Sequence, residues 1–176
     1  MQEAEVSLLL ALHYIRNGLT KADVKVSIDG AHVKTGNRIH FDIFGFLEEH
    51  RCKKLDTDAE RWQGIYQVEH FEPKLQISSV PGIGDVNIKL LSGEMLYVES
   101  KKGKSDKKGQ EYSLMREAIG QLMTGVEITE DIIPVVAVPY TTKSYELADR
   151  WSKLDQIQNV GIKFFLIKDD GSVKIV

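Results

Sequence analysis

The stretch that decides the fold is residues 84–101, with the sequence GDVNIKLLSGEMLYVESK. Polar and apolar side chains alternate over 85–90, a second strand is expected over 94–101, and Ser92 and Gly93 separate the two segments. Alternation with a period of two is typical of a β-strand, and a short loop with glycine is typical of a hairpin. The sequence therefore predicts two antiparallel strands joined near Gly93.

The register of this hairpin decides whether two of its acids can act together. A two-residue loop would point the carboxylates of Asp85 and Glu99 to opposite faces of the sheet, whereas a three-residue loop that starts at Leu91 sets them directly opposite each other. We predict the three-residue loop, or an equivalent bulge between Asp85 and Leu91, with Gly93 at positive φ.

Outside the hairpin, hydrophobic periodicity predicts alternating helices and strands. Helices are expected over 3–17, 110–124 and 142–158, and strands over 24–28, 39–43, 75–80, 132–138, 162–167 and 173–176. We expect 24–28 and 39–43 to pair as a hairpin and 75–80 to continue into 84–101 as a β-meander. The apolar run 132–138 should be buried on both faces.

The domain organisation follows from this order of elements. Residues 48–74 have a mixed, polar pattern that predicts a helix or an irregular insertion. The remainder predicts a single α/β domain over 1–176, with a central mixed β-sheet flanked by helices.

Composition excludes several classes of protein. The 176 residues are 42% hydrophobic and 28% charged, which is typical of a globular domain, and no apolar run reaches the roughly 18 residues of a membrane span. We therefore expect an intracellular, cytoplasmic protein without a membrane partner. The single Cys52 excludes an internal disulfide, and the five scattered histidines lack the spacing of a zinc site. The net charge of −3 means that any contact with nucleic acid must be local.

The strongest candidate for chemistry combines Asp85, Glu99, Lys101 and Gln121. Two neighbouring carboxylates bind a hard divalent cation such as Mg²⁺ or Mn²⁺, and a nearby lysine can orient water or stabilise charge on a phosphate. Glu99 and Lys101 share one face of their strand. Acid-x-Lys also occurs at 23–25, 72–74 and 106–108, but only Glu99 and Lys101 end a strand that pairs with a Gly-Asp strand.

These motifs resemble the PD-(D/E)xK nuclease superfamily, which has the restriction-endonuclease-like fold. The resemblance rests on five segments and covers most of the chain: Ala4-Glu5-Val6, Gly84-Asp85, Val98-Glu99-Ser100-Lys101, Gln121 on its helix, and Ile133-Pro134-Val135-Val136-Ala137-Val138. It implies Asp85 and Glu99 as metal ligands and Lys101 as the catalytic base or water-positioning group. It further implies Gln121 and Glu5 as site residues, since some families use a glutamine helix and archaeal Holliday junction resolvases use an acid on the first helix.

Two positions depart from the family pattern. Gly84 stands where the motif name has proline, and Gly125 stands where a Gln-x-x-x-Tyr motif would have tyrosine. Neither departure removes a metal ligand. A rival acid, Asp42, lies on the expected strand 39–43, but no Glu-x-Lys follows it, so we expect it on a surface or hairpin. Two of these residues also have a structural interpretation in place of a role in the site. Gln121 could lie on the solvent side of its helix, and Glu5 could be an acid that the helix dipole favours in the first turn.

Four lysines that follow Lys101 are predicted to contact the phosphates of DNA. They are Lys102, Lys104, Lys107 and Lys108. The resemblance thus implies a Mg²⁺-dependent DNA endonuclease, acting as a homodimer or within a larger nucleoprotein complex. The alternative is a catalytically inactive member of the same fold that binds nucleic acid or assembles a complex. A small-molecule enzyme is disfavoured because no Gly-rich phosphate loop opens a helix.

Overall fold

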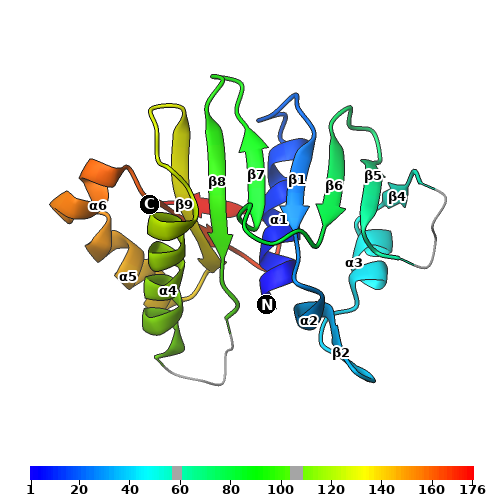
Figure 1. Cartoon of the computed structure of the whole chain (residues 1–176), viewed down its shortest axis with the longest axis horizontal. Coiled ribbons are helices and arrows are strands. Elements are labelled where there is room, and N and C mark those ends of the chain that lie inside the picture. The colour runs from blue at the N-terminus through cyan, green and yellow to red at the C-terminus, as the bar shows by residue number, and fades with distance from the viewer. Residues whose placement is uncertain (57–60, 104–108) are drawn as a thin grey trace.

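The computed structural model describes residues 1–56, 61–103 and 109–176, and its described part is built around one nine-stranded mixed sheet (Figure 1). The strand order is β11-β10-β9-β8-β7-β1-β6-β5-β4. Their bounds are β1 Val24–Ser27, β4 Cys52–Lys54, β5 Gly64–Val68, β6 Lys74–Ser78, β7 Val86–Lys89, β8 Met95–Ser100, β9 Ile132–Pro139, β10 Lys163–Ile167 and β11 Val173–Ile175. The β1/β6, β8/β9 and β9/β10 pairs are parallel, and the other pairs are antiparallel. The predicted α/β class with a large mixed sheet is therefore confirmed.

Helices cover the two faces of the sheet unequally. Helix α1 (Glu3–Arg16) packs ten buried residues on one face, against strands from β6 across to β10. On the other face, α4 (Gln110–Gly125) lies over β8 and β9, and α5 (Thr142–Trp151) lies over β10. Two apolar clusters result, one under α1 and one under α4 and α5. Because β8 and β9 are covered on both sides, their side chains are buried whichever way they point.

The strongly periodic segments fold as predicted. The helices expected over 3–17 and 110–124 correspond to α1 and α4, and the strand expected over 132–138 is β9, whose last six residues are all buried. The helix expected over 142–158 is interrupted, because the backbone of Leu154 is extended (ψ 131°), so that α5 ends at Trp151 and α6 (Asp155–Val160) starts afresh.

The expected hairpin of 24–28 with 39–43 is wrong. Strand β1 pairs with β6 and β7. The chain after β1 forms the short helix α2 (Gly30–Val33) and then strand β2 (Lys34–Thr35). Strand β3 (Arg38–Ile39) pairs only with β2. The alternation at 39–43 misled because Asp42 begins α3 (Ile43–Glu49): its side chain accepts a hydrogen bond from the Gly45 amide (3.1 Å), which is the geometry of a helix N-cap.

Two further expectations are corrected by the sheet topology. The β-meander is wrong because β1 lies between β6 and β7, where the Ser27 amide donates to the Asp85 carbonyl (2.8 Å) and the Ile28 amide to the Ser78 carbonyl (2.8 Å). Residues 48–74 form neither a new helix nor a separate body in their described part. After the end of α3 they supply β4, β5 and the start of β6, which extend the main sheet to its edge.

The described residues contain no helix with both the length and the apolarity needed to span a bilayer.

Candidate active site

The β7/β8 hairpin has the predicted register. Pairing runs from Lys89 opposite Met95 to Val86 opposite Val98, and the Leu90 amide donates to the Glu94 carbonyl (2.8 Å), which leaves a three-residue loop. Gly93 has φ 103°, in the region that favours glycine. The prediction of a three-residue loop with Gly93 at positive φ is confirmed.

Asp85 sits where this hairpin meets β1. Its amide donates to the carbonyl of Val98 (2.8 Å), which is already the partner of Val86, so two residues oppose one as in a β-bulge. Its carboxylate accepts a hydrogen bond from the Ser100 amide (2.7 Å). Ser100 is in turn fixed to α1, because the hydroxyl of Ser7 donates to the Ser100 hydroxyl (2.9 Å). The Asp85 carboxylate is thereby held against the end of β8.

A pocket of about 510 Å³ opens between this strand end and α4. Asp85 and Glu99 both line it, with Gln121 contributed by α4. The structure thus brings together three of the residues that the sequence singled out. Asp29, which the sequence analysis did not select, lines the same pocket from the end of β1 and caps α2 through a hydrogen bond from the Ala31 amide (2.9 Å).

Gly84 stands beside Asp85 for a steric reason. Its φ is 72°, which proline cannot adopt because its ring fixes φ near −65°. A Cβ at Gly84 would also lie 2.8 Å from the ring of Tyr97. The departure from proline in the motif is therefore a consequence of this turn. Gly125 differs from Gly84, because a Cβ there would lie 3.5 Å from the Tyr97 hydroxyl, which is an ordinary van der Waals contact.

We expect Gly84→Ala to lower the free energy of unfolding by at least about 2 kcal/mol, because it combines a left-handed backbone with a clash against Tyr97. Gly82→Ala is the matched control: its φ is 80°, but nothing lies within 4 Å of its added Cβ, so only the backbone cost of about 1 kcal/mol applies. Urea unfolding of both variants measures the difference. Equal losses would contradict the close contact with Tyr97.

Lys101 lies at the end of β8 between two carboxylates. Its ammonium is 3.2 Å from Glu117 of α4 and 4.0 Å from Glu3 of α1, and the residue is only 4% exposed. Glu117 is four residues before Gln121, so both project from one side of α4. The ammonium of Lys101 thus lies at the strand end that carries Glu99, a position that suits the stabilisation of negative charge on a phosphate. Sequence reasoning missed Glu117, and its helical spacing from Gln121 is the signal that could have found it.

The first-helix acid near this site is Glu3, whereas the sequence analysis selected Glu5. The carboxylate of Glu5 accepts a hydrogen bond from the Gln2 amide (3.0 Å) and so caps the start of α1. Two residues along a helix correspond to a rotation of about 200°, so these neighbouring acids point to nearly opposite sides. Asp42 is likewise a helix cap away from the pocket.

The two central acids have strongly perturbed proton affinities. Burial raises the pKa of Asp85 to about 6, against a smaller opposing effect of the hydrogen bond from the Ser100 amide. Burial, and then the charge of Asp85, raises the pKa of Glu99 to about 7, although Lys101 acts in the opposite direction. A bound cation would relieve the mutual repulsion of these two carboxylates.

These shifts give a signed prediction for stability without metal. Both acids keep their protons to a higher pH in the folded state than in the unfolded chain, so ionising them as pH rises through about 6 and 7 destabilises the fold. In EDTA at pH 8, the Asp85→Asn, Glu99→Gln double variant should be more stable than wild type by about 1–2 kcal/mol, after allowance for solvent screening. The advantage should vanish near pH 4.

The control for this measurement is Glu127→Gln, Glu130→Gln, which removes two exposed acids and should show no such gain. Urea unfolding from pH 4 to pH 8 would follow all three proteins. A double variant that is less stable than wild type at pH 8 would contradict the raised pKa values of Asp85 and Glu99.

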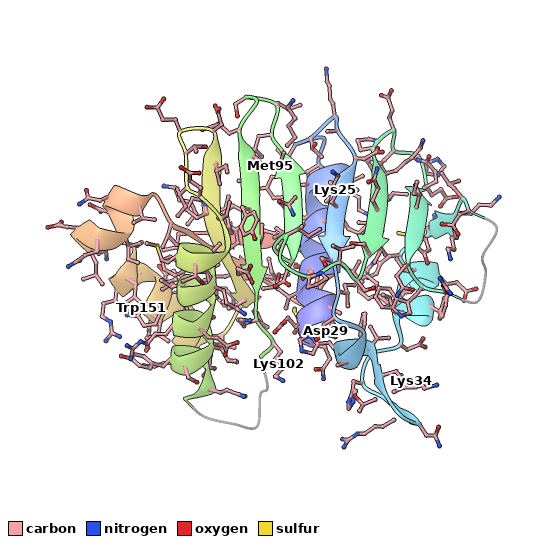
Figure 2. The ribbon with its side chains drawn as sticks, in the orientation of Figure 1. Lys25, Asp29, Lys34, Met95, Lys102 and Trp151 are labelled. Atoms are coloured by element: carbon pink, nitrogen blue, oxygen red, sulfur yellow. The ribbon has the colours of Figure 1, made fainter. Side chains whose placement is uncertain are left out.

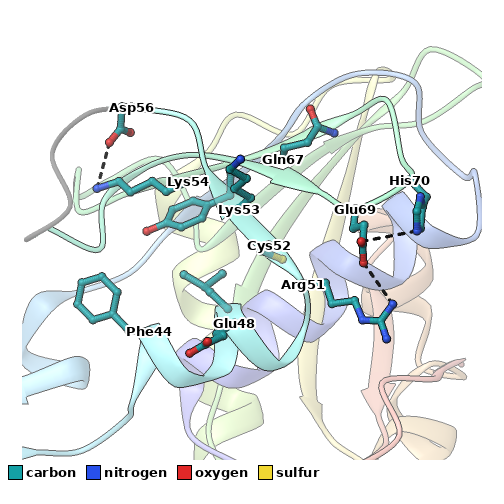
Figure 3. Close-up of a pocket in the computed structure, with 12 residues that line it drawn as sticks. Phe44, Glu48, Arg51, Cys52, Lys53, Lys54, Asp56, Gln67, Glu69 and His70 are labelled. Carbon is teal, nitrogen blue, oxygen red and sulfur yellow. Dashed lines mark hydrogen bonds and ion pairs between the residues drawn. The ribbon is translucent and has the colours of Figure 1, made fainter.

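A larger pocket of about 1040 Å³ lies between α3 and the strands β4 and β5 (Figure 3). Its charged groups include ion pairs between Arg51 and Glu69 (3.2 Å) and between Lys54 and Asp56 (3.1 Å). Burial raises the pKa of Cys52 to about 11, so its thiol is protonated at neutral pH and is a poor nucleophile. This pocket contains none of the predicted site residues, so it is the weaker candidate.

The donor set at Asp85 and Glu99 fits a small hard cation. The described residues contain no group of three or more His, Cys, Asp and Glu side chains arranged for a metal. Mg²⁺ is commonly held by one or two carboxylates and completes its shell with water and substrate oxygens, so two acids suffice.

Of the four predicted phosphate-binding lysines, Lys102 is partly exposed just after Lys101, while Lys104, Lys107 and Lys108 lie outside the described residues.

Comparisons of this chain with protein-family models, with curated proteins and with solved structures found no match.

Proposed function

We propose that this protein is a nuclease that hydrolyses phosphodiester bonds of DNA with the help of Mg²⁺ or Mn²⁺. The observation that carries the proposal is the pairing of two acids, the partly buried Asp85 and the buried Glu99, in one pocket, with the ammonium of Lys101 at the same strand end. The restriction-endonuclease-like arrangement of the fold is part of this proposal.

Each residue has a chemical role in the proposed reaction. Asp85 and Glu99 would hold the cation, which when bound would lower the pKa of a coordinated water and neutralise charge on the phosphate. Lys101 would orient the attacking water and stabilise the extra negative charge as the new oxygen–phosphorus bond forms. The attacking water would release a proton to solvent, the opposite oxygen–phosphorus bond would break, and the leaving oxygen would take up a proton from water. Gln121, at the mouth of the pocket, would donate a hydrogen bond to a phosphate or a water.

The raised proton affinities agree with this role. A carboxylate with a pKa near 7 is partly protonated at neutral pH, and a cation competes with that proton for the same oxygens. Cation binding, and cleavage with it, should therefore strengthen as pH rises from 6 to 8. At neutral pH, a bound cation would favour the fully ionised form because it would offset the repulsion between the two acids.

The test is cleavage of a panel of DNA forms in Mg²⁺ and in EDTA, by wild type and by Glu99→Ala. The panel comprises supercoiled plasmid, linear duplex, a four-way junction and single-stranded DNA. We expect Mg²⁺-dependent cleavage of at least one form by wild type and none by the variant. Binding without cleavage by wild type would instead favour the inactive nucleic-acid-binding module, and equal cleavage by both proteins would place the active site elsewhere.

A further inference from the structure

A small hairpin projects from the sheet at the end where the candidate site lies. It consists of β2 and β3 and follows α2, and Figure 1 shows it extending beyond the ends of β1 and β8. Figure 2 shows Asp29 and Lys102 at this end of the sheet, with Lys34 farther out on the hairpin and Met95 at the opposite end. Because Asp29 lines the candidate site and also caps α2, the hairpin begins at the wall of that pocket.

The base of the hairpin is well anchored. Val33 is buried, with 6% of the residue exposed. Its carbonyl accepts hydrogen bonds from the amides of His40 (2.8 Å) and Phe41 (3.3 Å). The hydroxyl of Thr35 donates to the Ala31 carbonyl (3.3 Å). A surface element held in this way needs little ordering when it binds a partner, so the cost of binding is low.

The hairpin itself is exposed and basic. All four strand residues are exposed, and Ile39 is 66% exposed at the surface. Residues 30–41 contain Lys34 and Arg38 but no acid, in a protein whose net charge is −3. Within the described part of the chain, neither Lys34 nor Arg38 forms an ion pair. Both cations are available to an anionic partner.

The pairing of the hairpin places these charges on opposite faces. Lys34 is directly opposite Ile39, and Thr35 is opposite Arg38. Directly opposed residues project from the same face, and successive residues from opposite faces, so Lys34 and Arg38 point away from each other. A ribbon that lay flat on a surface would use the charge of one face only. A ribbon that enters a groove of duplex DNA meets a phosphate backbone on each side, and the major groove, about 12 Å wide, admits a two-stranded ribbon.

We propose that the β2–β3 hairpin inserts into the major groove of duplex DNA, with Lys34 and Arg38, on its two faces, contacting the two phosphate backbones. This inference rests on the proposed nuclease function, and it narrows the substrate class to DNA with a duplex segment beside the cleaved bond. The hairpin positions the duplex relative to Asp85 and Glu99 and takes no part in the chemistry.

The experiment measures equilibrium binding of a fluorescent 30-base-pair duplex and of a 30-nucleotide single strand, in EDTA and across a salt series. Lys34→Gln, Arg38→Gln should weaken duplex binding by on the order of 10- to 100-fold at 0.1 M salt and should reduce the slope of log affinity against log salt by about 2. Single-strand binding should change far less.

The matched control is Arg150→Gln, Lys163→Gln, which also removes one exposed arginine and one exposed lysine, from α5 and from β10, a strand four places from β1 in the sheet. Circular dichroism and thermal unfolding confirm that each variant is folded. An equal loss in the control, an unchanged salt slope, or an equal loss on single-stranded DNA would overturn the groove contact.

Binding in EDTA separates this inference from the proposed catalysis. Wild type that binds duplex through the hairpin but never cleaves would contradict the nuclease and retain the groove contact. Wild type that cleaves DNA, with hairpin variants that bind duplex normally, would overturn the groove contact alone. Absence of duplex binding by wild type would also overturn the groove contact. A protein partner that binds the hairpin in place of DNA would overturn it as well.

Discussion

In Mg²⁺, Glu99→Gln and Asp85→Asn are each expected to reduce DNA cleavage about 10²- to 10³-fold or more, because the cation supplies several kcal/mol of transition-state stabilisation and each tenfold in rate is 1.36 kcal/mol. Both changes keep the shape of the side chain and remove its charge, so the fold should survive. The rates are measured on whichever DNA form wild type cleaves, under single-turnover conditions.

The matched control for these substitutions is Glu130→Gln, an exposed acid outside the pocket. It should cleave at the wild-type rate. If Glu99→Gln or Asp85→Asn cleaved as well as this control, that residue would not hold the cation. Circular dichroism and thermal unfolding should show that each variant has kept its fold.

The second large effect is expected at Lys101. Lys101→Met should reduce cleavage by about 10²- to 10⁴-fold, the range for a positioned group that transfers or orients a proton, and it should leave Mn²⁺ binding and most DNA binding in place. The apolar stem of methionine fills the buried position, which is 4% exposed. Single-turnover cleavage and duplex binding, measured side by side, separate the two effects.

Lys102→Met provides the comparison, because Lys102 is the next residue along the chain and is predicted to contact phosphate. It should weaken DNA binding modestly and should leave the maximal cleavage rate near that of wild type. The account of Lys101 would be contradicted if the two variants lost binding and cleavage in the same proportion, since both lysines would then act only as phosphate contacts.

The sequence predicted the site-bearing hairpin because its information is local. The period of two and the glycine at position 93 together fix the register, and the register decides which face each acid occupies. Gly84 and Gly93 mark the turns at each end of β7, and both have positive φ. The acid pair Asp85 and Glu99 could therefore be found without knowledge of the remaining strands.

What the sequence could not supply is the order of the strands and the direction of helical side chains. No local pattern indicates that β1 inserts between β6 and β7, because that choice depends on pairing between segments about 50 residues apart. Glu3 and Glu5 are both acids in the first turn of α1, and only the packing of the helix decides which one points toward Lys101.

Asp42 illustrates a conflict between two local signals. Residues 39–43 alternate in polarity and so resemble a strand, but an aspartate before an apolar run also favours a helix N-cap, and the cap prevails. The misassignment of this segment hid the β2–β3 hairpin, since its four paired residues are too few to give a periodic pattern.

The most direct test of the central claim, that Asp85 and Glu99 together hold a divalent cation, is calorimetric titration of Mn²⁺ at pH 8. Wild type is expected to show one saturable binding event that weakens at pH 6, where Glu99, with its pKa near 7, is largely protonated. The Asp85→Asn, Glu99→Gln double variant is expected to show none. Equal binding by the two proteins would contradict the account, because the cation would then be bound elsewhere.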